Sequence, residues 1–203
     1  MEYHFLAGLV SLFSGVGRNV RMDIPLHQIL TLVKNGHFAI EIHRLRQLRD
    51  QDVELYQKQK SRLLSFTPSG TFDRFRSTDR IKSMSGIMVL DFDFLDDVHN
   101  AKKQVIKSPY TLGCFISPSG QGLKVLVKTF SHPKATFRSS YESATRHYRR
   151  ILSKGLDKAD DVTRLCFVSH DPDLFWNPYS HEIKHKIRIY SYDPITKNLR
   201  SHY

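Results

Sequence analysis

The chain has 203 residues, and its 31 Lys and Arg against 20 Asp and Glu give a net charge of +11 at neutral pH. This length predicts one domain, or one domain with a small N-terminal extension, and a hydrophobic content of 40% is enough for a sizeable core. A surface this basic attracts polyanions, so nucleic acid is the leading class of partner. No apolar stretch is long enough to span a bilayer, and Cys114 and Cys166 indicate no disulfide framework.

The N-terminal third predicts a strand and two helices. The apolar run 5–13 is typical of a core strand, and Glu2 stands where a signal peptide would carry basic residues. A helix is expected to begin near Pro25 and to end at Gly36, because apolar residues recur between them with helical spacing. A second helix is expected over 52–64, with three basic residues on its exposed side: Lys58, Lys60 and Arg62.

A basic connector follows the second predicted helix. Its cations are candidates for contact with a nucleic-acid backbone: Arg74, Arg76, Arg80 and Lys82. The alternative is a solvated charged surface, which is the commoner role of such a run. The net charge of the chain adds weight to the first interpretation without deciding between the two.

The segment 87–93 carries the most specific feature of the sequence. Four apolar residues predict a buried strand, and at its end Asp91 and Asp93 leave the chain on the same face. Phe92 and Phe94 are expected to point the other way, towards a core. Two carboxylates this close repel each other unless a cation lies between them, and Mg²⁺ takes such oxygen ligands together with substrate phosphates. The pattern therefore indicates metal-dependent phosphoryl chemistry, with an ordinary acidic turn as the alternative.

Two apolar runs, 112–117 and 123–130, predict a pair of strands joined by a turn rich in glycine and serine. Glycines allow backbone N–H groups to approach an anion closely, and hydroxyl and ammonium groups add further donors. The candidates for contact with a triphosphate are Ser117, Ser119, Gly120, Gly122 and Lys124. The alternative is an ordinary hairpin with a solvated lysine.

Residues 155–164 form an acidic loop that leads into the apolar run 165–169. Asp157 or Asp161 could supply a third carboxylate to a metal site, and Arg164 could neutralise phosphate or hold one of the carboxylates. The alternative is a surface loop with local ion pairs, each of which contributes little.

A long helix is expected to begin at Pro133 and to end at Gly155. Between them, bulky or apolar residues repeat at intervals of three and four, which predicts a stripe that faces the core: Phe137, Tyr141, Ala144, Tyr148 and Ile151.

Residues 181–185 match the H-E-x-x-H pattern of zinc metalloproteases. That chemistry needs both histidines on one face of a helix, whereas isoleucines alternate with polar residues here and predict a strand. On a strand His181 and His185 would lie about 13 Å apart, too far to share one zinc ion. We therefore do not assign a zinc site.

The three segments, taken in order, resemble the motifs of the archaeo-eukaryotic primase superfamily. The sequence Asp91-Phe92-Asp93 resembles the first motif, the stretch 117–124 the second, and 157–164 with 169–172 the third. The similarity is greatest to the VirE N-terminal-like, primase-related domain of bacterial mobile elements. Residues 66–72 and 85–87 also resemble that branch. Lys124 stands where many primase-polymerases carry a histidine.

The resemblance implies an α/β (α+β) fold, with a mixed or antiparallel central sheet flanked by helices. An RRM-like catalytic core is expected over 83–180, an N-terminal α/β extension over 1–82, and a C-terminal strand over 181–192, all within one domain.

The resemblance also implies a primase/polymerase-type nucleotidyltransferase that acts on single-stranded DNA during replication of a mobile element in the bacterial cytoplasm. Asp91, Asp93 and Asp157 would hold two Mg²⁺ or Mn²⁺ ions. Lys124, Arg164 and the glycine/serine turn would bind a nucleoside triphosphate. A helicase domain or protein is a possible partner. The alternatives are a catalytically inactive single-stranded nucleic-acid-binding module and, with less support, a metal-dependent nuclease.

Overall fold

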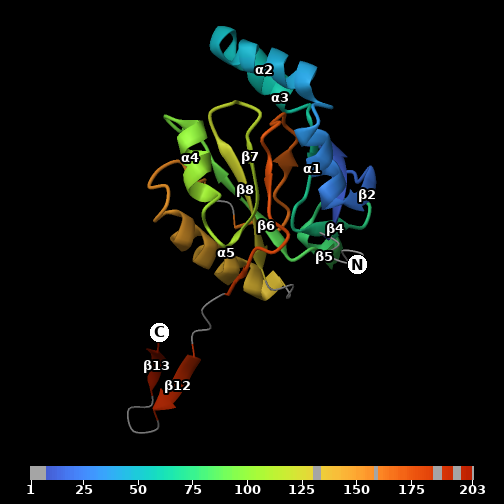
Figure 1. The fold of residues 1–203 in the computed structure, drawn as a ribbon. Coiled ribbons are helices and arrows are strands. Elements are labelled where there is room, and N and C mark those ends of the chain that lie inside the picture. Colours follow the sequence, from blue (N-terminus) through green and yellow to red (C-terminus); the bar gives the residue numbers. More distant parts are fainter. Residues whose placement is uncertain (1–7, 130–133, 158–159, 185–188, 194–197, 203) are drawn as a thin grey trace, which may run out of the picture.

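The computed structural model describes residues 8–129, 134–157, 160–184, 189–193 and 198–202. Helices and predominantly antiparallel sheets combine in it, so the expected α+β class is confirmed (Figure 1). No helix in this described part of the chain is long and apolar enough to cross a membrane.

The first sheet has the order β2-β1-β3-β9 and is antiparallel throughout. Its strands are β1 (Leu9–Ser14), β2 (Met22–Pro25), β3 (Leu64–Phe66) and β9 (Cys166–Phe167). The strand expected over 5–13 is thus found in its described portion, while residues 1–7 lie outside the described chain. Because β9 comes from the C-terminal third, this sheet unites distant parts of the sequence.

Three helices lie between β2 and β3, namely α1 (Leu26–Lys34), α2 (Ala39–Gln51) and α3 (Val53–Lys60). The prediction of α1 is confirmed, and the residues that it buries have the expected helical spacing: Leu26, Ile29, Leu30 and Val33. The helix expected over 52–64 ends at Lys60, because the chain enters β3 at Leu64. The sequence analysis missed α2, which buries only Ile42 and Leu45 and so shows little apolar periodicity.

The second sheet contains most strands of the core expected over 83–180, together with β11 from the expected C-terminal strand, whereas β9 of that core belongs to the first sheet. They are β6 (Ile87–Phe92), β7 (Thr111–Ile116), β8 (Leu123–Thr129), β10 (Phe175–Trp176) and β11 (Glu182–Ile183). Strand β8 lies between β6 and β7 and is antiparallel to both. Helix α4 (Val98–Val105) connects β6 to β7, and α5 (Lys134–Tyr148) follows β8. This β-α-β-β-α order, with β8 inserted between β6 and β7, is the split β-α-β arrangement of RRM-like cores.

Both faces of the second sheet are buried. On one face Met88, Leu90 and Val125 pack with side chains of α4 and α5. On the other face Val89 and Phe115 join the core formed by α1, α2 and the first sheet. Figure 1 shows α4 and α5 on one side of this sheet and α1 on the other. Asp91 follows Val89 by two residues, so the alternation of β6 places Asp91 on the face that packs against the first sheet.

The core stripe of α5 is confirmed for Phe137, Tyr141, Ala144 and Tyr148, which are buried, whereas Ile151 lies in the turn beyond the helix and is only partly buried. The helix ends at Tyr148, seven residues before the expected stop at Gly155, because turns occupy residues 149–151. Pro133, its expected first residue, lies outside the described chain.

The C-terminal strand expected over 181–192 is divided. Its first part is β11, and its last part belongs to β12 (Ile189–Asp193), which pairs with β13 (Asn198–His202) in a separate two-stranded sheet. Residues 185–188 between them lie outside the described chain. Another two-stranded sheet joins β4 (Gly70–Phe72) to β5 (Ile81–Met84), and a short 3-10 helix (Thr78–Arg80) precedes β5.

Both cysteines are expected to be unreactive in the native protein. Cys114 and Cys166 are fully buried, and burial raises the pKa of each thiol to about 12. At pH 8 only about one thiol in ten thousand would then be the nucleophilic thiolate. We expect iodoacetamide to modify neither residue in the native protein and both in denaturant, as counted by mass spectrometry. Rapid modification without denaturant would contradict this burial.

Candidate functional site

An ion-paired cluster forms around Asp91, on the strand end that the sequence singles out. The antiparallel register of β6 and β8 sets Asp91 directly opposite Lys124, and the Lys124 ammonium donates to Asp91 Oδ2. Arg164 Nη2 donates to the same oxygen at 3.2 Å and to Asp157 Oδ2 at 2.6 Å. The side chains of Asp91 and Lys124 are only 9% and 8% exposed. The structure therefore brings together residues from all three sequence motifs.

The charges of this cluster depend on one another. Burial alone would raise the pKa of Asp91, but the adjacent Lys124 and Arg164 outweigh it and hold that pKa below its usual value. Burial likewise opposes the charge on Arg164, yet its bonds to Asp157 and Asp91 raise the pKa of the guanidinium. Asp91 is thus ionised and neutralised by cations of the protein itself.

Asp93 has a different environment, although it lies two residues along the chain. It is half-buried, and within the described chain its carboxylate has neither an ion pair nor a hydrogen bond. Burial raises its pKa, and the nearby charges of Asp91 and Asp157 raise it further against the opposing effects of Lys124 and Lys60. Asp93 is therefore a carboxylate that a bound cation would stabilise.

The turn between β7 and β8 packs tightly against the end of β6. A methyl group at Gly122 would lie 2.3 Å from the Phe92 carbonyl oxygen and 3.2 Å from Asp93 Oδ1, so only glycine fits this position. Ser117 and Ser119 share a hydroxyl hydrogen bond of 2.9 Å. The Gly120 N–H donates to the Ser117 carbonyl within the turn, so this amide is not free for an anion as the sequence analysis expected.

Two arginines of α2 hold this turn, and the sequence analysis missed both of them. Arg46 Nη2 donates to the Ser117 carbonyl at 3.3 Å and to the His170 carbonyl at 3.1 Å. Arg49 donates to the Ser119 carbonyl. In Figure 1, α2 and α3 lie above the end of the sheet where β7 meets β8. A helix with little apolar periodicity thus contributes directly to the site.

Lys60 is a further basic residue near the site that the sequence analysis did not anticipate. It was expected on the exposed side of its helix, but the structure half-buries it near the carboxylates. Burial and the charge of Lys124 lower its pKa, while Asp93 and Asp91 act in the opposite direction. The correction comes from the tertiary position of the end of α3 near the Asp91 cluster, which the spacing of charged residues does not reveal.

The structure separates the two candidates for the third acid. Asp161 accepts bonds from the Thr163 N–H at 2.8 Å and the Thr163 hydroxyl at 2.7 Å, so it stabilises its own turn. Asp157 binds Arg164, and its N–H donates to the Asp91 carbonyl at 2.9 Å. Of the two, Asp157 is therefore the acid connected to the Asp91 cluster.

The basic connector is largely engaged within the protein. Arg76 donates to the Thr163 carbonyl at 2.9 Å and lies over the Phe13 ring. Arg80 pairs with Asp73 and Asp79 at 3.8 and 3.7 Å, and Lys82 pairs with Asp23 at 3.3 Å. Arg74 is exposed. Arg76 thus links this basic segment to the loop that carries Arg164. Of these four cations, Arg74 is the most available for contact with a polyanion.

The cluster offers carboxylate oxygens to a divalent cation. Within the described residues, no three His, Cys, Asp or Glu side chains are arranged as a complete metal site. However, Asp91 Oδ1 is buried and has no hydrogen-bond partner in this part of the chain, and Asp93 beside it is uncompensated. Carboxylate oxygens are the ligands that Mg²⁺ and Mn²⁺ prefer, with substrate phosphates and water completing the shell. Asp91 and Asp93 therefore fit a cation that is completed by substrate.

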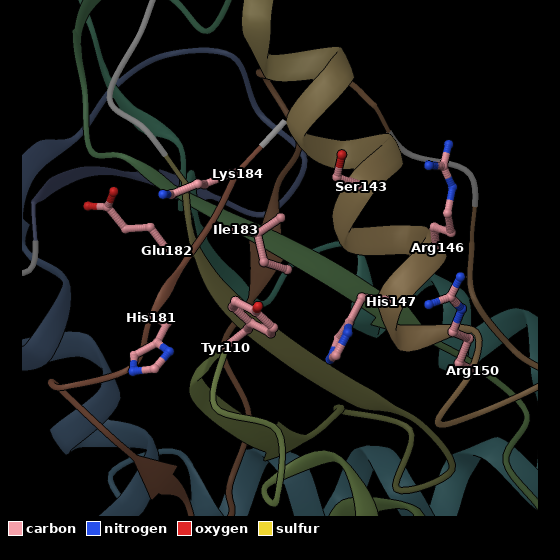
Figure 2. A pocket seen from close by; sticks show the side chains of 9 residues that line it. All are labelled: Tyr110, Ser143, Arg146, His147, Arg150, His181, Glu182, Ile183 and Lys184. Carbon is pink, nitrogen blue, oxygen red and sulfur yellow. The ribbon is translucent and has the colours of Figure 1, made fainter. Parts of the chain in front are cut away.

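A separate cavity of about 790 Å³ lies at the other end of the same sheet (Figure 2). Its lining includes Arg146 and His147 of α5, as well as Glu182 and Ile183 of β11. Strand β11 pairs with β8 at Lys128, four residues and about 13 Å from Lys124. In the H-E-x-x-H sequence, Glu182 begins β11 and His181 immediately precedes it, while His185 lies outside the described chain.

Comparison with known proteins gives a family for this fold and site. The model of the BT4734-like, N-terminal domain family matches residues 58–176, which is more than half of the chain, so the chain belongs to this family. The matched segment contains the whole Asp91 cluster and the β7–β8 turn, whereas α2 with Arg46 and Arg49 precedes it. No curated protein and no solved structure matches the chain.

Proposed function

We propose that this protein is a primase/polymerase-type nucleotidyltransferase domain of the archaeo-eukaryotic primase superfamily. It would extend a strand along a single-stranded DNA template with nucleoside triphosphates. The observation that carries the proposal is the convergence of Asp91, Asp93 and Asp157 with Lys124 and Arg164 at one end of β6 and β8. Acids and bases from three distant segments meet there beside a glycine/serine turn.

The proposed reaction joins the 3′-hydroxyl oxygen of the growing strand to the α-phosphorus of the triphosphate and releases pyrophosphate. Divalent cations held by Asp91 and Asp93, and by Asp157 as the third acid, would supply activation of that hydroxyl and stabilisation of the charge on the α-phosphate. Two such ions are proposed, with Mg²⁺ or Mn²⁺ as the chemical identity.

The cations of the protein would position the substrate. Lys124 and Arg164 reach Asp91 in the structure, and both could exchange part of that pairing for triphosphate oxygens. Lys60 adds a third positive charge on the same side. The hydroxyls of Ser117 and Ser119, in the turn whose carbonyl oxygens α2 holds, would contact the same phosphates together with Gly122. Such fixed groups contribute mainly orientation and charge stabilisation.

A second candidate is a catalytically inactive module that binds single-stranded nucleic acid. The observation that favours it is the neutralisation of Asp91 by Lys124 and Arg164, which satisfies this acid without any metal. A nuclease that uses the same carboxylates is a further alternative.

The proposed replicative role would place the protein in the cytoplasm of a bacterium, with a helicase domain or protein as a partner.

The decisive measurement is Mn²⁺-dependent incorporation of labelled nucleotides on a primed or unprimed single-stranded template. We expect products longer than the primer, or new oligonucleotides, only when metal, template and triphosphates are all present. Shortened template would instead indicate a nuclease. Template binding without any new product would favour the inactive module and contradict the proposed catalysis.

A further inference from the structure

Phe94 is the most exposed of the large apolar side chains in the described chain, at 85%. The sequence analysis expected it to point into the core, as Phe92 does, and the structure corrects this. Single exposed apolar residues are common on protein surfaces, so exposure alone indicates no function. Two further features distinguish Phe94 from the rest of the surface.

The first feature is its backbone. Phe94 has a φ of +54°, a conformation that a bulky L-residue seldom adopts. Strained backbone of this kind persists only where the surrounding structure imposes it, and it is concentrated at functional sites. Glycine or asparagine would adopt the same φ with less strain, yet the chain has an aromatic residue here.

The second feature is the way the neighbours of Phe94 are held. The Asp93 N–H donates to the Gly155 carbonyl at 2.8 Å, which fixes the residue before it to the loop of Asp157. The Leu95 N–H donates to the Gln121 carbonyl at 2.9 Å, which fixes the residue after it to the glycine/serine turn. Phe94 is therefore held at the junction of the acidic strand end and the turn, with its ring in solvent.

We propose that Phe94 is a stacking platform for a nucleobase at the rim of the Asp91 cluster. An exposed ring beside a phosphate-directed site would stack on the base whose phosphates that site holds, and stacking accepts every base because each has a π-face. The base belongs either to the incoming nucleotide or to the single-stranded template. The inference rests on the proposed function for the identity of its ligand.

The test compares Phe94→Ala, which removes the ring, with Phe94→Trp, which retains an aromatic surface. Tyr179→Ala is the matched control, because Tyr179 is also aromatic and is 72% exposed. Binding is measured by fluorescence anisotropy with a labelled oligonucleotide, the same oligonucleotide made abasic, and a labelled nucleoside triphosphate. Melting temperatures are measured in parallel to verify folding.

We expect Phe94→Ala to weaken binding of the oligonucleotide or of the triphosphate by about 5- to 150-fold, and to leave binding of the abasic strand unchanged. Phe94→Trp and Tyr179→Ala should bind as the unchanged protein does. Loss confined to the oligonucleotide identifies the template base, and loss confined to the triphosphate identifies the incoming base.

Equal binding of both base-bearing ligands by Phe94→Ala and the unchanged protein would overturn the inference, as would an equal loss on the abasic strand. These outcomes are separate from the test of catalysis. A base-specific loss in a protein that incorporates no nucleotide would retain Phe94 as a binding residue while the proposed polymerase activity fails.

Discussion

Asp93→Asn is expected to slow nucleotide incorporation by about 10²–10³-fold while the melting temperature stays the same or rises. The folded protein raises the pKa of Asp93, first by burial and then by repulsion from Asp91, so its ionised form is disfavoured on folding. Removing this charge relieves that cost. In the proposed mechanism the same charge would hold a metal ion, and losing a major electrostatic contact in a transition state typically slows a reaction by about 10²–10³-fold.

The effect on stability should depend on pH. For a carboxyl whose folded pKa is raised, the penalty is complete above the folded pKa and disappears as the pH falls below the unfolded value, near 3.8. Any gain in melting temperature from Asp93→Asn should therefore be present at neutral pH and vanish in acid. The contribution of Asp91 to stability has the opposite sign. Its lowered pKa stabilises the fold at neutral pH, and that stabilisation is lost on acidification.

The control for this prediction is Asp96→Asn, an exposed acid three residues further along the same loop. It should change neither incorporation nor melting temperature. Isothermal titration with Mn²⁺ gives a second measurement that does not depend on turnover, and Asp93→Asn should remove the binding heat. Full activity in Asp93→Asn would eliminate the two-carboxylate metal site and, with it, the central element of the proposed chemistry.

The acidic strand end and its partner could be predicted in part from the sequence. The alternation of a strand indicates that Lys124 faces away from Leu123 and Val125, but the register that sets it opposite Asp91 depends on the pairing of β6 with β8. The identity of the third acid, Asp157 and not Asp161, likewise depends on backbone pairing between distant segments. Both acids lie in one loop, and only the bridge between Phe92 and Leu156 decides which of them reaches the cluster.

The residues that the sequence analysis missed come from elements with little apolar periodicity. Helix α2 buries only two residues and is rich in charged ones, so neither its existence nor the contacts of Arg46 and Arg49 follow from hydrophobic spacing. Lys60 could not be distinguished from Lys58, because both lie near the end of the same charged helix. Phe94 breaks the alternation because it lies beyond the end of β6 and has a positive φ, so its side chain does not continue the strand pattern.

A second buried ion pair, separate from the Asp91 cluster, holds the end of β7 in place. Lys102 Nζ donates to Asp171 Oδ2 at 2.6 Å and to the Asp173 carbonyl at 2.8 Å. The Asp171 oxygen also accepts from the Ile116 N–H at 2.8 Å, immediately before Ser117 of the glycine/serine turn. The side chains of Lys102 and Asp171 are only 10% and 2% exposed, so neither charge can be solvated if its partner is lost.

Lys102→Met is therefore expected to destabilise the protein by about 3–5 kcal/mol, because it leaves the Asp171 charge buried and unpaired. For a chain of this size that corresponds to a fall in melting temperature of roughly 6–20 °C. Lys103→Met is the matched control, since Lys103 is the next residue on α4 and is exposed. The double variant Lys102→Met/Asp171→Asn should recover more than half of the loss, since the asparagine side chain keeps an acceptor for the Ile116 N–H without a charge. Thermal unfolding followed by circular dichroism measures all three variants, and an equal effect of the Lys102 and Lys103 substitutions would show that the buried pair contributes nothing to stability.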